Sequence, residues 1–288
     1  MAPTVPGPSS DASTVIELVA ERLRAVGMRN VDCRATARIP IVLFIDPDSG
    51  LECDISVLNP LALRNTALLR AYSTVDPRVP ALAYVVKHWA KRRMVNNASE
   101  GTLSSYGYLL CLLHFLQTRD PPVVPNLQAL PPDWTGQPVS VPMEPSPNLP
   151  RAVTRHPLDG KEYNTYFYNP QCKLLLDRLP GRPSEIENDQ SNDLLRAFSR
   201  RNTESVGQLL AGFFRYYAWE FDYRRHAVSI RAGGAVDKEA KAEADCWQIH
   251  TRLSVEDPFE TWYDVAHVLK WSRHRHVRLE FARAYTLL

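Results

Sequence analysis

Several features that assign a chain to a particular class are missing from these 288 residues. No apolar run approaches the roughly 20 residues that cross a bilayer, so we expect no membrane contact. The first 14 residues lack the basic stretch and apolar core of a secretory signal. The five cysteines are scattered without C-x-x-C spacing, which argues against a zinc site and for a reducing compartment. We expect a cytoplasmic protein, with the nucleus as a second candidate location.

A strong excess of charge is also missing, because 34 Lys and Arg residues nearly balance 32 Asp and Glu residues. The net charge of +2 excludes a bulk polycation. Basic residues gather locally instead, at 87–93 (KHWAKRR), 224–226 (RRH) and 270–278 (KWSRHRHVR). A solvated helix face is the ordinary explanation of each cluster, and binding of a polyanion is the other.

The first part of the chain combines a helix with a β-hairpin. Residues 1–13 are small and polar, and we expect them to be disordered. Apolar spacing then predicts a helix from about residue 14, followed by strands at RIPIVLFI and LECDISV around the turn DPDSG. In the second strand Asp54 falls on the polar face, because side chains alternate along a strand.

From position 60 onward the pattern is mainly helical. The stretch ALAYVVKHWAKRRM is predicted to bury Leu82, Val85, Val86 and Trp89 and to place its lysines on the opposite face. The stretch LSSYGYLLCLLHFLQ is apolar nearly all round, which predicts a buried central helix whose first turn alone is polar. Residues 205–223 predict another amphipathic helix.

Other segments are expected to be irregular or short. More than half of the 23 prolines lie between positions 121 and 183, so we expect a Pro-rich irregular segment over 121–190. The stretch AVSIR reads as a short strand, GGAVDKEAKAEAD as a flexible loop, and the last 30 residues as one or two helices.

The order of polar residues is compatible with a nucleotide site. A strand carboxylate can hold Mg²⁺, two lysines one helical turn apart can neutralise a triphosphate, and a helix N-terminus can bind phosphate. An aromatic side chain next to these groups can stack on a base. Spacing alone supports this interpretation only weakly.

Five motifs together are specific to one protein family. They are ARIPIVLFIDPDSGLECDISV, NPLALRNTALLRAY, KHWAKRR, GTLSSYGYLLCLLHFLQ and EDPFE. The chain resembles the RNA terminal nucleotidyltransferase family, which includes terminal uridylyltransferases and cytoplasmic poly(A) polymerases. The likeness covers about residues 36–130 and 205–268. It implies an α+β fold: the end of a polymerase-β-like mixed sheet over 14–58, then a helical central domain over 59–288. The poly(A) polymerase-associated segment would lie within that domain, at about 205–268.

The resemblance also implies roles for single residues. Asp54 matches a carboxylate of the catalytic metal triad, with a solvated strand residue as the alternative. Asn65 matches a ribose contact, or is a helix cap. Lys87 and Lys91 match the triphosphate lysines, or form a solvated helix face.

Further positions match the base-binding part of such a site. Ser105 matches a triphosphate contact and Tyr106 the aromatic that stacks on the incoming base; a cap and a core aromatic are the alternatives. Asp257 and Glu260 match positions near the base edge, or cap a turn. Uridine-adding members that select UTP strictly over other nucleotides have a histidine at the position of Tyr263. The tyrosine weakens the case for strict use of UTP.

A second departure concerns the metal. The family's first two carboxylates come as Asp-x-Asp or Asp-x-Glu after a Gly-Ser or Gly-Gly pair, and residues 1–36 contain no match. A third departure is His267, where an arginine is common. We therefore expect an incomplete chain that is inactive alone and exposes apolar surface.

The resemblance implies a reaction and an alternative to it. In the reaction, AMP or UMP is added to RNA 3′ ends from ATP or UTP with Mg²⁺ or Mn²⁺. In the alternative, an inactive relative acts as an RNA- or partner-binding module. Transfer to an acceptor other than RNA is a third interpretation. The ligands expected are an RNA 3′ end and a nucleoside triphosphate, and protein partners stay open.

Overall fold

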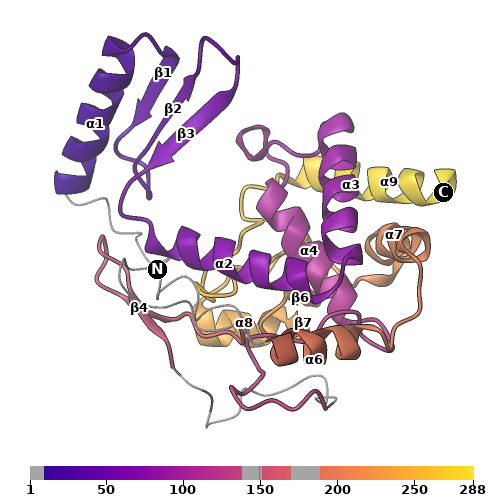
Figure 1. Ribbon diagram of the computed structural model, residues 1–288. Coiled ribbons are helices and arrows are strands. Elements are labelled where there is room, and N and C mark those ends of the chain that lie inside the picture. Colours follow the sequence, from indigo (N-terminus) through magenta and orange to yellow (C-terminus); the bar gives the residue numbers. More distant parts are fainter. Residues whose placement is uncertain (1–9, 138–148, 150, 170–188) are drawn as a thin grey trace. The chain divides into compact units, whose positions relative to one another are not determined.

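The computed structural model describes residues 10–137, 149, 151–169 and 189–288 (Figure 1). The chain divides into two compact units, one formed by residues 1–66 with 151–165 and the other by 67–150 with 166–288. Within the described part, none of the helices is long and apolar enough to cross a membrane.

The first unit is a helix on a three-stranded antiparallel sheet, with a separate hairpin (Figure 1). The sheet order is β1-β2-β3, and the second strand pairs with both of the others. The elements are α1 (Ser10–Ala25), β1 (Arg29–Arg34), β2 (Ile41–Ile45) and β3 (Glu52–Ser56), with β4 (Val153–Arg155) and β5 (Glu162–Asn164) as the hairpin. The predicted hairpin of 38–57 is therefore confirmed, while β1 was not predicted.

The two faces of this sheet differ in chemistry. Val42 on β2 is fully buried in one cluster with Ile16 and Ala20 of α1. The next residue of β2, Leu43, points to the other face, since side chains alternate along a strand. Leu43 pairs with Asp32 on β1 and with Asp54 on β3, so both carboxylates lie on the face away from α1.

Residues 10–13, predicted to be disordered, form the first turn of α1 instead. Ala12 is fully buried, and the Ser13 hydroxyl donates a hydrogen bond to the Ala35 carbonyl at 3.0 Å. These contacts offset the entropy cost of ordering the turn, which the polar composition of the segment did not reveal. Residues 1–9 lie outside the described residues.

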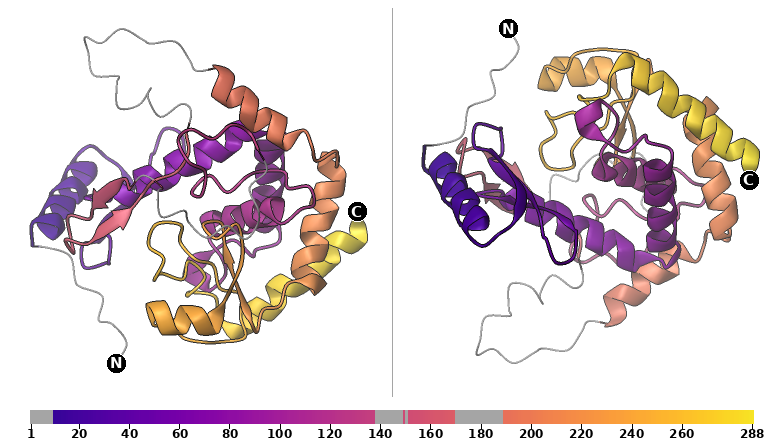
Figure 2. Two further views of the ribbon diagram at one scale, coloured as in Figure 1. Left: turned by 90° about the horizontal axis from the view of Figure 1, so that it is seen from below. Right: turned by 90° about the horizontal axis from the view of Figure 1, so that it is seen from above.

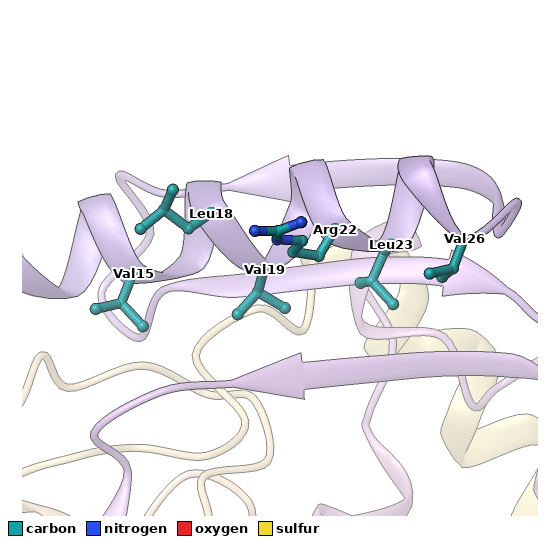
Figure 3. Close-up of a pocket in the computed structure, with 6 residues that line it drawn as sticks. All are labelled: Val15, Leu18, Val19, Arg22, Leu23 and Val26. Carbon is teal, nitrogen blue, oxygen red and sulfur yellow. The ribbon is translucent and has the colours of Figure 1, made fainter.

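One flank of α1, beside the stripe that packs on the sheet, is apolar (Figure 3). Val15, Leu18 and Val26 keep 46%, 56% and 67% of their surfaces exposed. With Val19, Arg22 and Leu23 they line a shallow groove along the helix. This unit therefore exposes apolar side chains along one helix.

The second unit is mainly helical, with one two-stranded sheet. Helix α2 begins in the first unit and ends in the second, and Figure 2 shows α9 running alongside α7. The elements are α2 (Pro60–Val75), α3 (Arg78–Arg92), the 3₁₀ turn η1 (Ala98–Glu100), α4 (Ser105–Gln117), α6 (Asp189–Ser199), α7 (Val206–Arg215), the π-helical turn η2 (Tyr216–Glu220), β6 (His226–Ser229), β7 (Gly234–Asp237), α8 (Lys238–Asp245) and α9 (Trp271–Leu287).

Helix α4 is the centre of this unit, as its apolar composition predicted. Leu110–Gln117 are buried without interruption. Aromatic rings from two other helices pack around its first half: Trp89 of α3 stacks on Phe281 of α9 at 5.1 Å, and both contact Tyr108. On α3 the prediction failed for Val85, which is 42% exposed because Val79, Leu82, Val86 and Ala90 already fill the buried stripe.

The stretch 233–245, predicted to be a flexible loop, is ordered as β7 and α8. β7 pairs with β6 from His226↔Asp237 to Ser229↔Gly234. The Asp237 side chain caps α8 by accepting from the Glu239 N–H at 2.8 Å. The polar composition hid a helix whose lysines turn inward.

Arg78, at the start of α3, joins segments more than 120 residues apart. Its guanidinium forms an ion pair with Asp76 at 2.9 Å and donates to the carbonyls of Ser199 at 3.2 Å, Asn202 at 3.0 Å and Glu204 at 2.6 Å. Although burial alone would raise the pKa of Asp76, hydrogen bonds from Arg78 and Ser199 hold it below its usual value. The link between α6 and α7 therefore depends on one buried cation.

Replacing Arg78 by Met should lower the free energy of unfolding by about 3 kcal/mol, because Asp76 would stay buried without its partner. Arg92→Met, an exposed position on the same helix, is the matched control and should change it by less than about 0.5 kcal/mol. Urea denaturation followed by circular dichroism measures both. Equal effects of the two variants would contradict the assigned role of Arg78.

Candidate nucleotide-binding site

Helix α3 presents the two predicted triphosphate lysines. Lys87 and Lys91 are exposed and lie one turn apart on the same face, opposite the buried stripe of the helix. Helix α3 contains no acidic residue that could neutralise them. A pair of ammonium groups at this spacing can bind the oxygens of a polyphosphate.

The loop between α3 and α4 places the first turn of α4. Gly101 has φ +83, and a Cβ built on it would lie 2.6 Å from Cγ of Lys270, so both its conformation and its packing require glycine. The Lys270 N–H donates to the Gly101 carbonyl at 3.0 Å, which ties the loop to the start of α9. Ser104 caps α4, and Ser105 accepts a hydrogen bond from the Asn96 amide at 2.9 Å. The capping role thus belongs to Ser104 and not to Ser105.

Tyr106, in the first turn of α4, contacts the motif EDPFE directly. Its hydroxyl donates to Oδ2 of Asp257 at 3.1 Å, although 151 positions separate the two residues. Burial and the Asp257 carboxylate raise the pKa of Tyr106 well above its usual value, so the phenol stays a donor at neutral pH. The structure thus brings two of the predicted base-binding residues together.

The turn that follows Asp257 is held by its own hydrogen bonds. Oδ1 of Asp257 accepts from the N–H groups of Phe259 at 2.9 Å and Glu260 at 3.0 Å. The Asp257 N–H donates to the Tyr263 carbonyl at 3.1 Å, and the Tyr263 N–H donates to the Glu260 carbonyl at 2.7 Å. One oxygen of Asp257 therefore caps the turn, as the alternative predicted, while the other accepts from Tyr106.

Asp257 is an unfavourable place for a charge. Its surface is 3% exposed, and burial raises its pKa despite the hydrogen bonds that lower it. Glu256 and Glu260 beside it are also buried. Perturbed carboxylates of this kind are more frequent at functional sites than elsewhere.

Asp54 and Asn65 belong to the other unit. Asp54 is exposed on β3. Asn65 lies inside α2, and the cap of that helix is Asn59, whose side chain accepts from the Ala62 N–H at 3.2 Å. The cap alternative for Asn65 is therefore wrong. Its Oδ1 is buried with no hydrogen-bond partner among the described residues, which suits an acceptor for a ligand hydroxyl.

The described residues do not supply a complete site for a divalent metal. They contain no group of three or more His, Cys, Asp or Glu side chains placed to hold an ion. Asp54 shares its sheet face with Asp32, which forms an ion pair with Arg34 at 2.9 Å and lies two strands away. Asp54 by itself would supply only part of the oxygen ligands of Mg²⁺, and water and substrate phosphate oxygens commonly supply others. No metal-dependent step follows from these residues.

His267 follows the base-edge turn, residues 256–261, in the sequence. Its ring lies 5.1 Å from that of Tyr263, and its Nδ1 is 2.9 Å from the Asp264 carbonyl. Two buried lysines of α8, Lys238 and Lys241, were missed by the sequence analysis. Their spacing in KEAKAEAD, directly after a capping Asp237, was the signal that could have predicted an inward-facing helix.

The geometry can be compared with known proteins. Residues 4–74 match the family described as poly(A) RNA polymerase, mitochondrial-like, central palm domain, and residues 205–262 match Cid1 family poly A polymerase. A crystal structure of the Cid1 poly(U) polymerase with Mg and 3′-dATP bound is 31% identical, with a TM-score of 0.67. The similarity covers 100% of this chain and 73% of that one. The chain belongs to the Cid1 family of poly(A) and poly(U) polymerases.

Similar curated proteins include a poly(A) RNA polymerase and a terminal uridylyltransferase. Poly(A) RNA polymerase cid13 of Schizosaccharomyces pombe is 34% identical over 98% of this chain, and human terminal uridylyltransferase 7 is 39% identical over 87%. The chain spans 41% of the first relative and 14% of the second. The resemblance to this family and the α+β fold predicted from the sequence are thereby confirmed.

Asp257→Asn should stabilise the fold at neutral pH, because the amide keeps the shape of the side chain without its charge. A carboxyl whose pKa is raised on folding contributes stability below its unfolded pKa of about 3.9 and loses that contribution as pH rises through the folded value. The variant should therefore be the more stable protein at pH 7, and the difference should shrink towards pH 4. Thermal unfolding between these values measures it; a difference independent of pH would contradict the assignment.

Loss of either lysine should weaken nucleotide binding. We expect Lys87→Ala and Lys91→Ala each to raise the Kd for ATP about tenfold, the cost of one charge-assisted contact. Arg92→Ala removes an exposed charge next to Lys91 and is the matched control. Isothermal titration at two salt concentrations measures the Kd of the three variants. An unchanged Kd in both lysine variants would show that Lys87 and Lys91 do not bind the triphosphate.

Proposed function

We propose that this protein transfers nucleotides from a nucleoside triphosphate to the 3′ end of RNA. This chain would supply the contacts to the base and the triphosphate. The proposal rests on one observation above all: the hydrogen bond between Tyr106 and Asp257 joins the positions that the family uses for stacking and for the base edge. Membership of the Cid1 family supports the same reaction class.

Each group has a chemical task under this proposal. Lys87 and Lys91 bind the triphosphate, and the ring of Tyr106 stacks on the incoming base. When ionised, Asp257 accepts hydrogen bonds, and Oδ2 has a lone pair left beside the bond from Tyr106. Adenine offers its amino group and uracil its ring N–H as a donor. Asn65 accepts from a ribose hydroxyl through its unpaired Oδ1.

The nucleotide transferred is AMP or UMP. Among the relatives, cid13 is named a poly(A) RNA polymerase and the human relative a terminal uridylyltransferase. Tyr263 stands in place of the histidine of the more discriminating uridine-adding members, so we propose a weaker preference for UTP than theirs. The variant Tyr263→His should shift the ratio of the Kd values for ATP and UTP towards UTP.

The second candidate is a non-catalytic relative that binds RNA or a protein partner and retains the nucleotide pocket. The lack of a carboxylate group for a metal among the described residues favours it. Under the first proposal, catalysis depends on carboxylates beyond the described ones. The two candidates share the nucleotide contacts and differ only in whether RNA is extended.

An extension assay separates them. Labelled RNA is incubated with Mg²⁺ and each nucleoside triphosphate, using the 288-residue chain and a longer form that adds an Asp-x-Asp or Asp-x-Glu pair upstream. We expect binding without extension by the 288-residue chain, and extension by the longer form that is lost in Asp54→Ala. Nucleotide binding with no extension by either form would favour the binding module. Extension by the 288-residue chain would show that two further carboxylates are not needed.

A further inference from the structure

Helix α8 buries two lysines, although lysine is rarely buried. Lys238 is 2% exposed and Lys241 is 8% exposed. A buried ammonium is stable only when its donors are satisfied, so the acceptors of each lysine indicate what it holds together.

Lys241 uses all three donors of its ammonium group. Nζ contacts the carboxylate of Asp245 on its own helix, the Oε2 atom of Glu256 at 2.7 Å, and the backbone carbonyl of Thr261 at 2.7 Å. It also lies 5.0 Å from the centre of the Trp247 ring. One side chain therefore connects α8 to two points outside it.

The two residues that Lys241 contacts outside α8, Glu256 and Thr261, are the ends of the base-edge turn. Glu256 directly precedes Asp257, and Thr261 directly follows Glu260. Glu256 is itself fixed, because its Oε1 accepts from the Ser229 hydroxyl at 2.8 Å and its N–H donates to the Val228 carbonyl at 2.8 Å. Lys241 thus links an anchored residue before the turn to the backbone after it.

We propose that Lys241 is a positioning residue that sets the base preference of the nucleotide site, an inference that rests on the proposed function. It does so by holding the ends of the turn 256–261 at a fixed separation, with the Asp257 carboxylate beside Tyr106. A hydrogen-bonding site discriminates between bases only if its acceptors are held in place before the base arrives. Without Lys241, the turn can relax and Asp257 can meet different base edges equally well.

Lys238 provides a matched control on the same helix. Its ammonium donates to the carbonyls of Tyr223 at 2.7 Å, His250 at 2.8 Å and Arg252 at 2.6 Å, none of which belongs to the turn. Burial lowers the pKa of Lys238 to about 8, so it is largely charged at pH 7. Substitution of either lysine removes a buried cation, but only Lys241 contacts the turn.

The test compares Lys241→Met with Lys238→Met in the 288-residue chain. The Kd values for ATP, UTP, CTP and GTP are measured by isothermal titration, and thermal unfolding is recorded in parallel. We expect Lys241→Met to reduce the ratio between the weakest and the tightest Kd by at least about fivefold, the effect of one lost hydrogen bond. Lys238→Met should lower the melting temperature while leaving that ratio unchanged.

The outcomes separate the two proposals. If the wild-type chain binds no nucleotide, the proposed function fails. If it binds nucleotides and Lys241→Met keeps the wild-type ratio, or if both variants change the ratio equally, the positioning role is overturned. A wild-type chain that binds all four nucleotides equally also overturns it, because there is then no preference to set.

A second variant covers the case in which Lys241→Met does not fold. Lys241→Met combined with Glu256→Gln removes both charges of the buried pair, and the amide can still accept from Ser229. We expect this double variant to fold and to show the same reduced ratio. A folded double variant with the wild-type ratio would contradict the role of Lys241.

Discussion

A helix that is apolar on nearly all sides needs neighbours on nearly all sides, and α4 imposes this constraint on the second unit. Leu110–Gln117 are buried without a break, and α4 packs against α3, α7, β6 and β7. The polar side chains of α4 that are not buried lie in its first turn, where Ser104 caps the helix and Ser105 and Tyr106 remain half-buried. The candidate site lies at this end because only there can a ligand reach polar groups of the central helix.

Charged groups that are buried, or paired with a buried partner, are the second organising feature, and each connects distant parts of the chain. Arg78 joins the start of α3 to the segment between α6 and α7, Arg93 forms an ion pair with Glu280 of α9 at 2.6 Å, and Lys241 bridges the ends of the base-edge turn. Such pairs contribute little net stability compared with apolar packing, but removing one partner is costly. They specify which segments meet, which is what a binding site assembled from separate motifs requires.

The carboxylates near Tyr106 illustrate the conflict between stability and function. Asp257 is buried with a raised pKa, so its charge costs stability at neutral pH. The cost is offset in part by two backbone N–H groups and the Tyr106 hydroxyl, which donate to the Asp257 carboxylate. A turn held in this way resists rearrangement, which is the property needed to distinguish one base from another.

The sequence by itself determined the family, the α+β class, the hairpin carrying Asp54, the buried central helix and the identity of the candidate site residues, because these follow from motifs and local periodicity. The roles of those residues stay a prediction. Only the tertiary structure decided that Tyr106 meets Asp257, that Ser104 and Asn59 are the caps, and that Asn65 has an unpaired oxygen. It also revealed β1, the first turn of α1 and the ordered helix α8 in segments that composition marked as polar. The reason is physical: a polar side chain looks solvated in a sequence, and only the fold shows whether a distant partner satisfies it once it is buried.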